Sequence, residues 1–299
     1  MKILLTGAQG QVGWELQRSL ALLGPVHAVG RAELDLSDAA AIRQLMRAVR
    51  PTVVVNAAAY TAVDNAENDE ALAYRINAEA PGVLAAEAAR LGAGLVHYST
   101  DYVFDGSQPA AYIEEDVPNP RSAYGRTKLA GEHAVMANTS QHVVLRTTWV
   151  YAPRGRNFPL TMLKLGRERD HLRVVADQLG APTPARLIAD ATALILQQIT
   201  AHGTPEKASW AQAGLYHLSC GGSASWYDFA RRVLAWQAAQ TGRAGPTIEA
   251  ITTAQYPTPA TRPHNSVLNN ERLRDTFGLV LPHWERAFEL CFEDIHAAV

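Results

Sequence analysis

The sequence predicts an α/β protein with a doubly wound parallel sheet in its first half and a smaller C-terminal α/β domain. Three observations lead to this prediction. Short apolar runs alternate with helical patterns in the order βαβαβαβ along residues 2–100, which is typical of a parallel sheet covered by helices on both faces. A glycine-rich turn joins the first strand to the first helix. After residue 150, prolines and glycines separate shorter elements.

The first strand runs from Lys2 to Thr6, and the first helical pattern runs from Trp14 to Leu23. Between them, the glycines are spaced as G-x-x-G-x-x-G. Such a turn lets a pyrophosphate approach the backbone, where the free N–H groups of the helix N-terminus bind it. Strand, glycine turn and helix together predict a Rossmann-like dinucleotide site. We expect five residues of the turn to contact the cofactor: Gly7, Gly10, Gln11, Val12 and Gly13.

The end of the second strand, Val26–Val29, indicates which dinucleotide is bound. NAD-selective folds usually place a carboxylate there, which accepts hydrogen bonds from the adenosine ribose. This chain has Gly30 and Arg31 instead, and a guanidinium suits the 2′-phosphate of NADPH. A solvated surface arginine is the alternative, and use of NADH stays open. Asp35 and Leu36 complete the expected cofactor edge.

The next elements continue the alternation. Ser37 is the expected N-cap of a helix that ends before Pro51. Thr52–Ala59 is a near-continuous apolar run, typical of a strand covered on both faces. A helical region from Asp69 to Leu91 and a fourth strand, Leu95–Thr100, follow. The third strand ends in small residues that leave room for a flat ligand, or that pack tightly on a helix: Ala57, Ala58 and Ala59.

Right-handed crossovers bring the C-terminal ends of parallel strands to one crevice. We expect three residues to line it: Gly7, Ala59 and Thr100. Beyond a polar loop, a helix at 123–136 carries Tyr124 and Lys128 one turn apart on one face. A Lys ammonium stabilises a neighbouring phenolate and lowers the pKa of the tyrosine, which makes a proton donor near neutral pH. A chance pair on a solvated helix is the alternative.

The chain changes character after a strand at His142–Thr147. We place a boundary near Tyr151, with a cofactor-binding domain in residues 1–150 and a substrate-binding domain in 151–299 whose segments interleave with the first. The second half is expected to contain four helices and two short strands: Phe158–Arg169, Ala185–Thr200, Trp226–Thr241 and Pro282–Ala297, then Leu172–Val175 and Leu215–Leu218.

Arg262 lies in a proline-rich segment of this second half, residues 256–266. The prolines restrict the backbone, and the planar fork of arginine suits bidentate contact with phosphate oxygens. We therefore expect Arg262 to bind the diphosphate of a sugar nucleotide. Pairing with a local carboxylate is the alternative.

Composition excludes several classes of partner. The chain has 299 residues, of which 47% are hydrophobic and 19% charged, and a net charge of −2. Its dispersed basic residues predict no binding to nucleic acid or to an anionic membrane. We expect neither a signal peptide nor a membrane span. Cys220 and Cys291 fit no metal-ligand spacing and suit a reducing compartment, so a soluble, cytoplasmic protein is expected.

Long motifs extend over both halves of the chain: GQVGWEL (10–16), NAAAYTAVD (56–64), HYSTDYVF (97–104), TKLAGE (127–132), RTTWVY (146–151), DQLGAPT (177–183) and YPTPATRP (256–263). With Tyr124 and Lys128, these strings resemble the extended short-chain dehydrogenase/reductase family. Within it, the chain resembles the branch of dTDP-4-dehydrorhamnose reductases along nearly its whole length. The resemblance implies NADPH-dependent reduction of the C4 keto group of dTDP-4-dehydro-6-deoxy-L-mannose to dTDP-L-rhamnose.

The resemblance also implies roles for individual residues. Tyr124 would donate the proton to the sugar O4, Lys128 would hold the nicotinamide ribose and lower the Tyr124 pKa, and Thr100 would hydrogen-bond the carbonyl oxygen. Asp101 and Trp149 would contact the substrate. Three further residues would contact the cofactor: Tyr60, Thr61 and Tyr98.

One departure from the family pattern concerns a metal. Some members hold a magnesium ion with glutamates at a dimer interface. Glu15 is present here, but Arg186 stands at the position of the second glutamate, and the third falls near Glu293 or Asp294. An arginine would repel the cation and could pair with Glu15 across an interface. We therefore predict no metal site, and a homodimer stays open.

Three rival readings remain. Another sugar-nucleotide reductase or epimerase of the family would share the fold and the motifs. A 4,6-dehydratase would carry a glutamate base at position 102, where this chain has Tyr102. A non-catalytic relative, like the regulatory subunit of methionine adenosyltransferase, would not need the set of Thr100, Tyr124 and Lys128.

Overall fold

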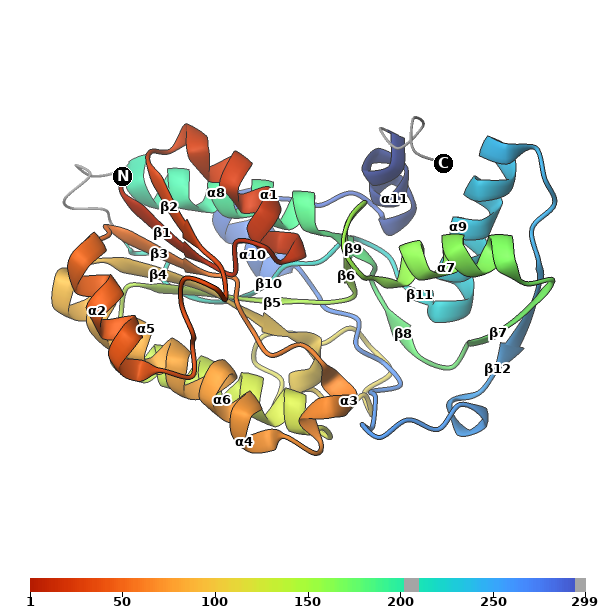
Figure 1. The fold of residues 1–299 in the computed structure, drawn as a ribbon, viewed down its shortest axis with the longest axis horizontal. Coiled ribbons are helices and arrows are strands. Elements are labelled where there is room, and N and C mark those ends of the chain that lie inside the picture. The colour runs from red at the N-terminus through yellow and green to blue at the C-terminus, as the bar shows by residue number, and fades with distance from the viewer. Residues whose placement is uncertain (202–209, 294–299) are drawn as a thin grey trace.

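A computed structural model describes residues 1–201 and 210–293, which form two bodies side by side (Figure 1). The larger body is built on a six-stranded sheet in the order β10-β5-β4-β3-β1-β2, with every neighbouring pair parallel. Its strands are β1 (Ile3–Thr6), β2 (Val26–Val29), β3 (Val53–Asn56), β4 (Gly94–Thr100), β5 (His142–Thr147) and β10 (Gly214–His217).

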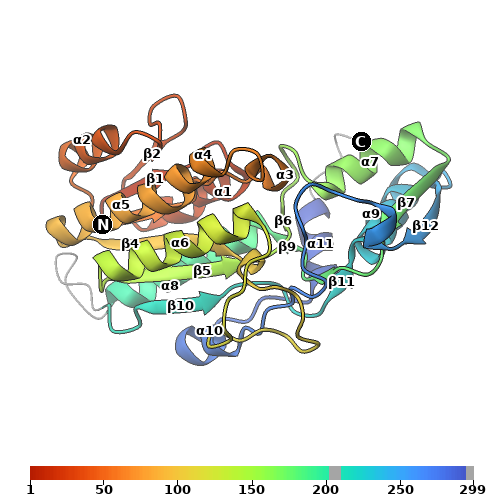
Figure 2. The same ribbon diagram turned by 90° about the horizontal axis from the view of Figure 1, so that it is seen from below.

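Helices cover both faces of this sheet, as Figures 1 and 2 show. One face carries α2 (Ala39–Val49), α4 (Glu70–Tyr74), α5 (Ala80–Leu91) and α6 (Ala123–Asn138). The other carries α1 (Gln11–Ser19), α8 (Ala185–Ala201) and α10 (Glu271–Phe277), while the short α3 (Val63–Ala66) lies beyond the strand ends. This arrangement confirms the predicted α/β fold with a doubly wound parallel sheet.

The described part of the smaller body contains three helices and three short strand pairs. Its helices are α7 (Phe158–Glu168), α9 (Trp226–Thr241) and α11 (Trp284–Phe292). The strands pair as β6 (Val150–Tyr151) with β9 (Thr183–Pro184), β7 (His171–Val175) with β12 (Thr247–Ile251), and β8 (Leu179–Gly180) with β11 (Ala224–Ser225). Short 3₁₀ turns are η1 (Leu20–Leu22), η3 (Asp101–Val103) and η4 (Thr253–Gln255).

The C-terminal half of the chain is shared between the two bodies. The segments of α8, β10 and α10 return to the larger body, where β10 pairs with β5 and becomes the edge strand. The rest of the second half forms the smaller body around an aromatic core that includes Tyr151, Phe229 and Phe288. The strand ends of the sheet point toward this smaller body (Figure 1).

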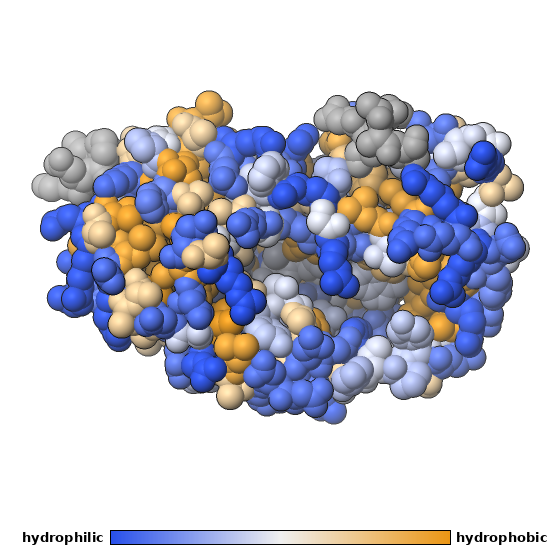
Figure 3. Space-filling model, viewed as in Figure 1, coloured by the Kyte–Doolittle hydropathy of each residue, from blue (hydrophilic) through white to orange (hydrophobic). Residues whose placement is uncertain are grey.

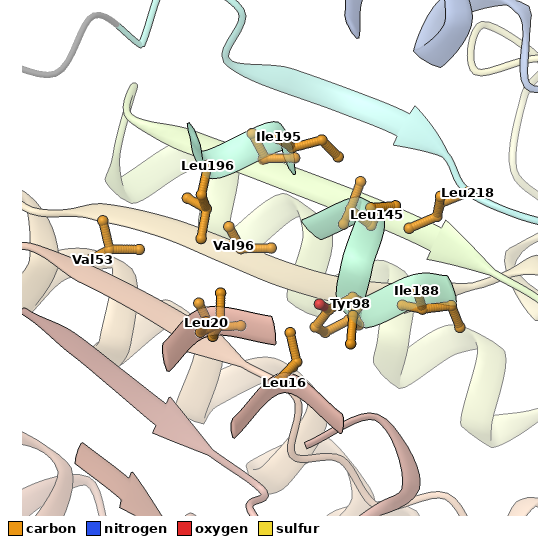
Figure 4. Packing of buried hydrophobic residues seen from close by; sticks show 14 of the residues in the cluster. Leu16, Leu20, Val53, Val96, Tyr98, Leu145, Ile188, Ile195, Leu196 and Leu218 are labelled. Atoms are coloured by element: carbon orange, nitrogen blue, oxygen red, sulfur yellow. The ribbon is translucent and has the colours of Figure 1, made fainter. Parts of the chain in front are cut away.

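Burial on both faces explains the nearly continuous apolar strands. Val53, Val96 and Leu145 face α1 and α8, where Leu16 and Ile195 pack on them (Figure 4). The alternate residues of these strands, such as Val54 and Leu95, pack under α2 and α5 in a separate cluster. Each fully buried aliphatic side chain contributes about 1.5–3 kcal/mol, so the two layers hold the strand ends in fixed positions.

Several predicted boundaries were wrong in detail. The N-cap of α2 is Asp38, whose carboxylate accepts from the backbone N–H groups of Ala40 and Ala41. Ser37 is not the cap because its hydroxyl donates to Asp35 Oδ1 at 2.8 Å. The third strand ends at Asn56, so the alanines follow it as a loop. The expected helix at Pro282–Ala297 begins at Trp284, and its last residues lie outside the described part of the chain.

The predicted helix at 69–91 contains one turn of π-helix, η2 (Arg75–Glu79), between α4 and α5. Such turns are frequent at functional sites because they turn a side chain away from the regular helical face. No helix in the described residues is long and apolar enough to cross a membrane.

His217 on β10 should make the stability depend on pH. Burial lowers its pKa to about 3, and the positive charge of Arg146 acts in the same direction. The unfolded chain therefore gains a proton below pH 6.5 that the folded chain does not bind, and stability is lost as the pH falls, by about 1.4 kcal/mol per unit. Urea unfolding of the parent and of His217→Gln should show a steeper loss for the parent between pH 6.5 and 5. Parallel curves would contradict this.

Candidate active site

The glycine turn after β1 has the shape that a dinucleotide requires. Gly7 adopts φ +74°, and a Cβ there would lie 2.7 Å from the backbone nitrogen of Ala58. A Cβ on Gly13 would lie 2.0 Å from the Gly7 carbonyl oxygen. Gly10 is the N-cap of α1 and has no side chain to cap it, so no N-cap side chain occupies the N–H groups of the first turn, which includes Gln11 and Val12. These residues fit a bound pyrophosphate.

The loop after β2 forms one edge of this site. Arg31 is exposed there, as is Asp35, whereas Leu36 is buried in the core beneath. No sequence motif indicated Glu33. Its carboxylate accepts a hydrogen bond from the Gly30 N–H at 2.8 Å. An acid therefore does lie at the end of β2, three residues later than the position where we looked for one. Arg31 and Glu33 thus place charges of opposite sign at this edge of the site.

The loop after β3 forms the other edge. Ala57, Ala58, Ala59 and Tyr60 are half-buried, and Thr61 is exposed. Asn77, on the π-helical turn, clamps this loop: it accepts from the Tyr60 N–H at 2.8 Å and donates to the Tyr60 carbonyl at 3.1 Å. The same amide donates to the Thr127 hydroxyl of α6 at 3.1 Å. Asn77 thus fixes the loop relative to α6, a role that no sequence motif indicated.

Thr100 and Tyr124 meet at the end of β4. The Thr100 hydroxyl lies close enough to the Tyr124 phenol to affect its pKa, and it donates to Asp101 Oδ1 at 2.9 Å. Ser122 caps α6 by accepting from the Gly125 N–H, which fixes the first turn that carries Tyr124. The Tyr102 ring packs edge-on against Tyr124, with 5.6 Å between the ring centroids.

The expected direction of the Tyr124 pKa was wrong for the free chain. Burial raises the pKa of Tyr124 to about 12, the nearby Thr100 hydroxyl opposes the rise, and the negative charge of Asp101 adds to it. The spacing of Tyr124 and Lys128 shows that they share a helix face, but it does not show that both are withdrawn from water. The phenol is therefore protonated at neutral pH.

Lys128 lies one turn further along α6 and is only 2% exposed. Its Nζ donates to the Tyr98 carbonyl oxygen at 2.6 Å and lies 3.4 Å from His97 Nε2. Burial lowers the pKa of Lys128 to about 8, against the opposing effect of Glu132. The Tyr98 ring points to the opposite face of the sheet, where its hydroxyl bonds Thr192 at 2.6 Å. Only its backbone reaches the site.

Asp101 and Trp149 lie beside this pair. Asp101 is buried, which raises its pKa, and it accepts from the Thr148 hydroxyl at 2.6 Å. Trp149 adopts φ +44°, and its ring stacks on Trp226 with 3.5 Å between centroids. Both rings pack against the core of the smaller body, Trp149 just after the chain leaves β5. Trp226 was not predicted as a site residue. A Ser-x-x-Asp capping box in the sequence does place it at the first position of α9.

Arg262 reaches the larger body through an ion pair. Its two terminal nitrogens lie 2.8 and 3.1 Å from the Asp64 carboxylate on α3, and it also bonds Thr258. The alternative, in which Arg262 pairs with a carboxylate, is therefore what the structure contains, although Asp64 is distant from it in the sequence. A cavity of about 520 Å³ adjoins this pair, and Figure 3 shows the surface hollowed between the bodies. The lining of the 520 Å³ cavity includes three basic side chains: Arg121, Arg262 and His264.

The residues present do not fit a magnesium site. Arg186 Nε lies 3.5 Å from Glu15 Oε2 within one chain, rather than across an interface. Glu293 pairs with Arg286 at 3.1 Å, and Asp294 lies outside the described residues. In residues 1–201 and 210–293, no three His, Cys, Asp or Glu side chains gather as metal ligands would.

The structure thus brings the glycine turn, the loop after β3, Thr100, Asp101, Tyr124 and Lys128 to the C-terminal ends of β1, β3 and β4. Because β1 lies between β2 and β3 in the sheet, this edge is the topological switch point where doubly wound folds bind ligands. A protonated tyrosine beside a dinucleotide turn can donate a proton to a carbonyl that receives hydride.

Comparisons with known proteins agree with this geometry. Residues 1–297 match the family described as RmlD substrate binding domain. A dTDP-4-dehydrorhamnose reductase from Burkholderia thailandensis is 50% identical over 99% of both chains. The crystal structure of such a reductase from Clostridium acetobutylicum has a TM-score of 0.89 and 38% identity, covering 98% of this chain and 99% of its own.

A further solved relative, the dTDP-4-dehydrorhamnose reductase from Bacillus anthracis in complex with NADP, has a TM-score of 0.87 and 33% identity. It is covered over 100% of its length, and this chain over 98%. The resemblance found in the motifs is confirmed over both bodies. The chain is an oxidoreductase that belongs to the dTDP-4-dehydrorhamnose reductase family.

Proposed function

We propose that this protein reduces the C4 keto group of dTDP-4-dehydrorhamnose to give dTDP-L-rhamnose, with NADPH as the reductant. The observation that carries the proposal is the proximity of Thr100 and Tyr124 at the end of β4, beside an uncapped glycine turn. Relatives with the same fold carry the name of this activity over the full chain. The NADP complex of one relative supports the choice of cofactor.

NADPH, when bound, supplies the hydride to C4 of the sugar. Tyr124 supplies the proton to O4, and its pKa of about 12 ensures that the phenol carries that proton at neutral pH. Thr100 donates to the same oxygen as negative charge develops there. The phenolate that remains on Tyr124 is stabilised by a positive charge on Lys128, which lies one turn further along the same face of α6.

Asp101 and the tryptophan stack orient the substrate in this proposal. The buried Asp101 carboxylate holds the Thr100 and Thr148 hydroxyls on either side of the strand end. The Trp149 ring, stacked on Trp226, offers an apolar surface against which a 6-deoxy sugar ring packs. The substrate would then lie between the two bodies, with its diphosphate toward the basic cavity around Arg121 and Arg262.

Two rival activities receive less support. A dehydratase needs a carboxylate base after Thr100-Asp101, whereas Tyr102 packs on Tyr124 and has a pKa raised further by burial. A purely regulatory role would not require the buried Lys128 and the neighbouring Thr100 and Tyr124 that the site contains. Oxidation of NADPH in the presence of the sugar nucleotide separates these possibilities.

Tyr124→Phe should cut turnover by roughly 10²–10⁴-fold, the usual cost of losing a general acid. The affinity for NADPH should remain close to that of the parent, because the ring and the helix are kept. Turnover is measured by the decrease in NADPH absorbance with dTDP-4-dehydrorhamnose, and affinity by fluorescence titration. Turnover close to the parent rate would show that another group supplies the proton.

Arg31 should set the preference for NADPH. We expect a KM for NADPH at least tenfold lower than for NADH, because a charged hydrogen bond to the 2′-phosphate contributes about 1.5–3 kcal/mol. Arg31→Ala should remove this difference, while Glu33→Gln should increase it by removing the nearby negative charge. Equal KM values for the two cofactors in the parent would rule out the role of Arg31.

Arg262 should act on the substrate and not on the cofactor. Arg262→Lys should raise the KM for the sugar nucleotide and leave the Kd for NADPH unchanged, because lysine lacks the bidentate fork. Asp64→Asn is the matched variant: it breaks the ion pair but keeps the guanidinium. If both variants lower thermal stability alike and neither changes the substrate KM, the pair only braces α3 against the smaller body.

A further inference from the structure

A row of buried polar side chains crosses the sheet and ends at Lys128. Thr6 on β1, Asn56 on β3 and His97 on β4 are register partners on adjacent strands, so their side chains lie on the same face. The three residues are 0–1% exposed. The neighbouring positions on this face are apolar and pack under the helices. A sheet that needed only packing here would have apolar side chains at these positions too.

Each member of the row is hydrogen-bonded to the next. The Thr6 hydroxyl donates to Asn56 Oδ1 at 2.6 Å. The amide nitrogen of Asn56 lies 3.0 Å from His97 Nδ1, and His97 Nε2 lies 3.4 Å from Lys128 Nζ. The row therefore connects the strand that precedes the glycine turn with the lysine of the candidate active site.

The direction of these hydrogen bonds constrains Lys128. Because Thr6 donates to the Asn56 oxygen, the Asn56 amide N–H donates to His97 Nδ1. A neutral imidazole then carries its proton on Nε2, which faces Lys128. An N–H group and an ammonium are both donors, whereas the lone pair of a neutral amine can accept from Nε2–H. The free amine at the same time donates to the Tyr98 carbonyl at 2.6 Å.

We infer that His97 is a positioning residue for Lys128: held by Asn56 and Thr6, it keeps the Lys128 nitrogen against the Tyr98 carbonyl and favours the neutral amine in the free protein. An ammonium on Lys128 then requires the opposite hydrogen-bond directions. The Asn56 oxygen would face His97 Nδ1–H, and the lone pair of His97 Nε2 would face Lys128. This inference rests on the proposed role of Lys128. Beyond that role, the protonation state of Lys128 is coupled to the buried hydrogen bonds of three strands.

The other groups around Lys128 are compatible with this coupling. Tyr124 and Glu132 lie on its own helix, and Glu132 is bound in two hydrogen bonds, of 2.8 and 2.7 Å, to Arg146 from β5. Asp101, which follows β4, is occupied by the Thr100 and Thr148 hydroxyls. From β4 itself, His97 has a pKa well below its usual value because of burial and the charge of Lys128. The imidazole is thus neutral whenever Lys128 titrates.

The test is a titration of Lys128 in the free protein. The chain has only four lysines, so ¹³Cε-lysine NMR gives few signals, and Lys128→Arg identifies the one of interest. In the parent, that signal should titrate near pH 8. In His97→Gln, the side-chain carbonyl can accept from the ammonium, and the midpoint should rise by about one pH unit. Thr6→Val keeps the shape of the side chain but removes the hydroxyl that donates to the Asn56 oxygen, so the Asn56 amide can take either orientation. This milder change should raise the Lys128 midpoint by less than His97→Gln does.

His217→Gln is the matched control, because His217 is another fully buried histidine of the same sheet but bonds the Tyr112 carbonyl. It should leave the Lys128 midpoint unchanged. An unchanged midpoint in both His97→Gln and Thr6→Val would overturn the inference. The titration needs no substrate, so its result is independent of the proposed reaction, whose failure would show as absent NADPH oxidation in the parent enzyme.

Discussion

The buried ion pair between Glu132 and Arg146 fixes the helix on which the candidate site depends. Both side chains are at most 2% exposed, and the guanidinium contacts the carboxylate in two hydrogen bonds. Removing one partner of such a pair leaves an uncompensated charge in the interior, at a cost of about 3–5 kcal/mol. Because Tyr124, Lys128 and Glu132 are spaced by four residues on α6, the position of Glu132 over β5 also sets the positions of the other two.

Close packing completes this arrangement. A Cβ on Gly125 would lie 2.2 Å from the Tyr102 carbonyl oxygen, and one on Gly131 would lie 2.0 Å from the Asn77 carbonyl oxygen. Two glycines in the interior weaken an isolated helix by roughly 1 kcal/mol each. The helix therefore gains its stability from docking, and Tyr124 and Lys128 take up their places only when the sheet is complete.

Much of the fold and part of the site could be predicted from local sequence. The strand-turn-helix at the N-terminus and the Tyr124/Lys128 spacing are short-range signals, and the structure places both as the patterns indicate. What could not be predicted depends on distant partners. Arg262 and Asp64 are far apart in the chain, as are Trp149 and Trp226. The pKa of Tyr124 depends on how far the phenol is buried, which spacing along a helix does not reveal. Asp38 and not Ser37 caps α2, because the Ser37 hydroxyl is hydrogen-bonded to Asp35.

The edge strand β10 lies far along the chain from its neighbour β5, and this order has a consequence for synthesis of the protein. This edge strand comes from residues 214–217, although its neighbour β5 ends at residue 147. A chain emerging from the ribosome therefore exposes the N–H and C=O groups along the outer side of β5 while some seventy further residues are synthesised. An open, apolar strand edge of this kind is a site for pairing with other chains. The interleaved order of the segments thus lengthens the interval in which a nascent chain is vulnerable to aggregation.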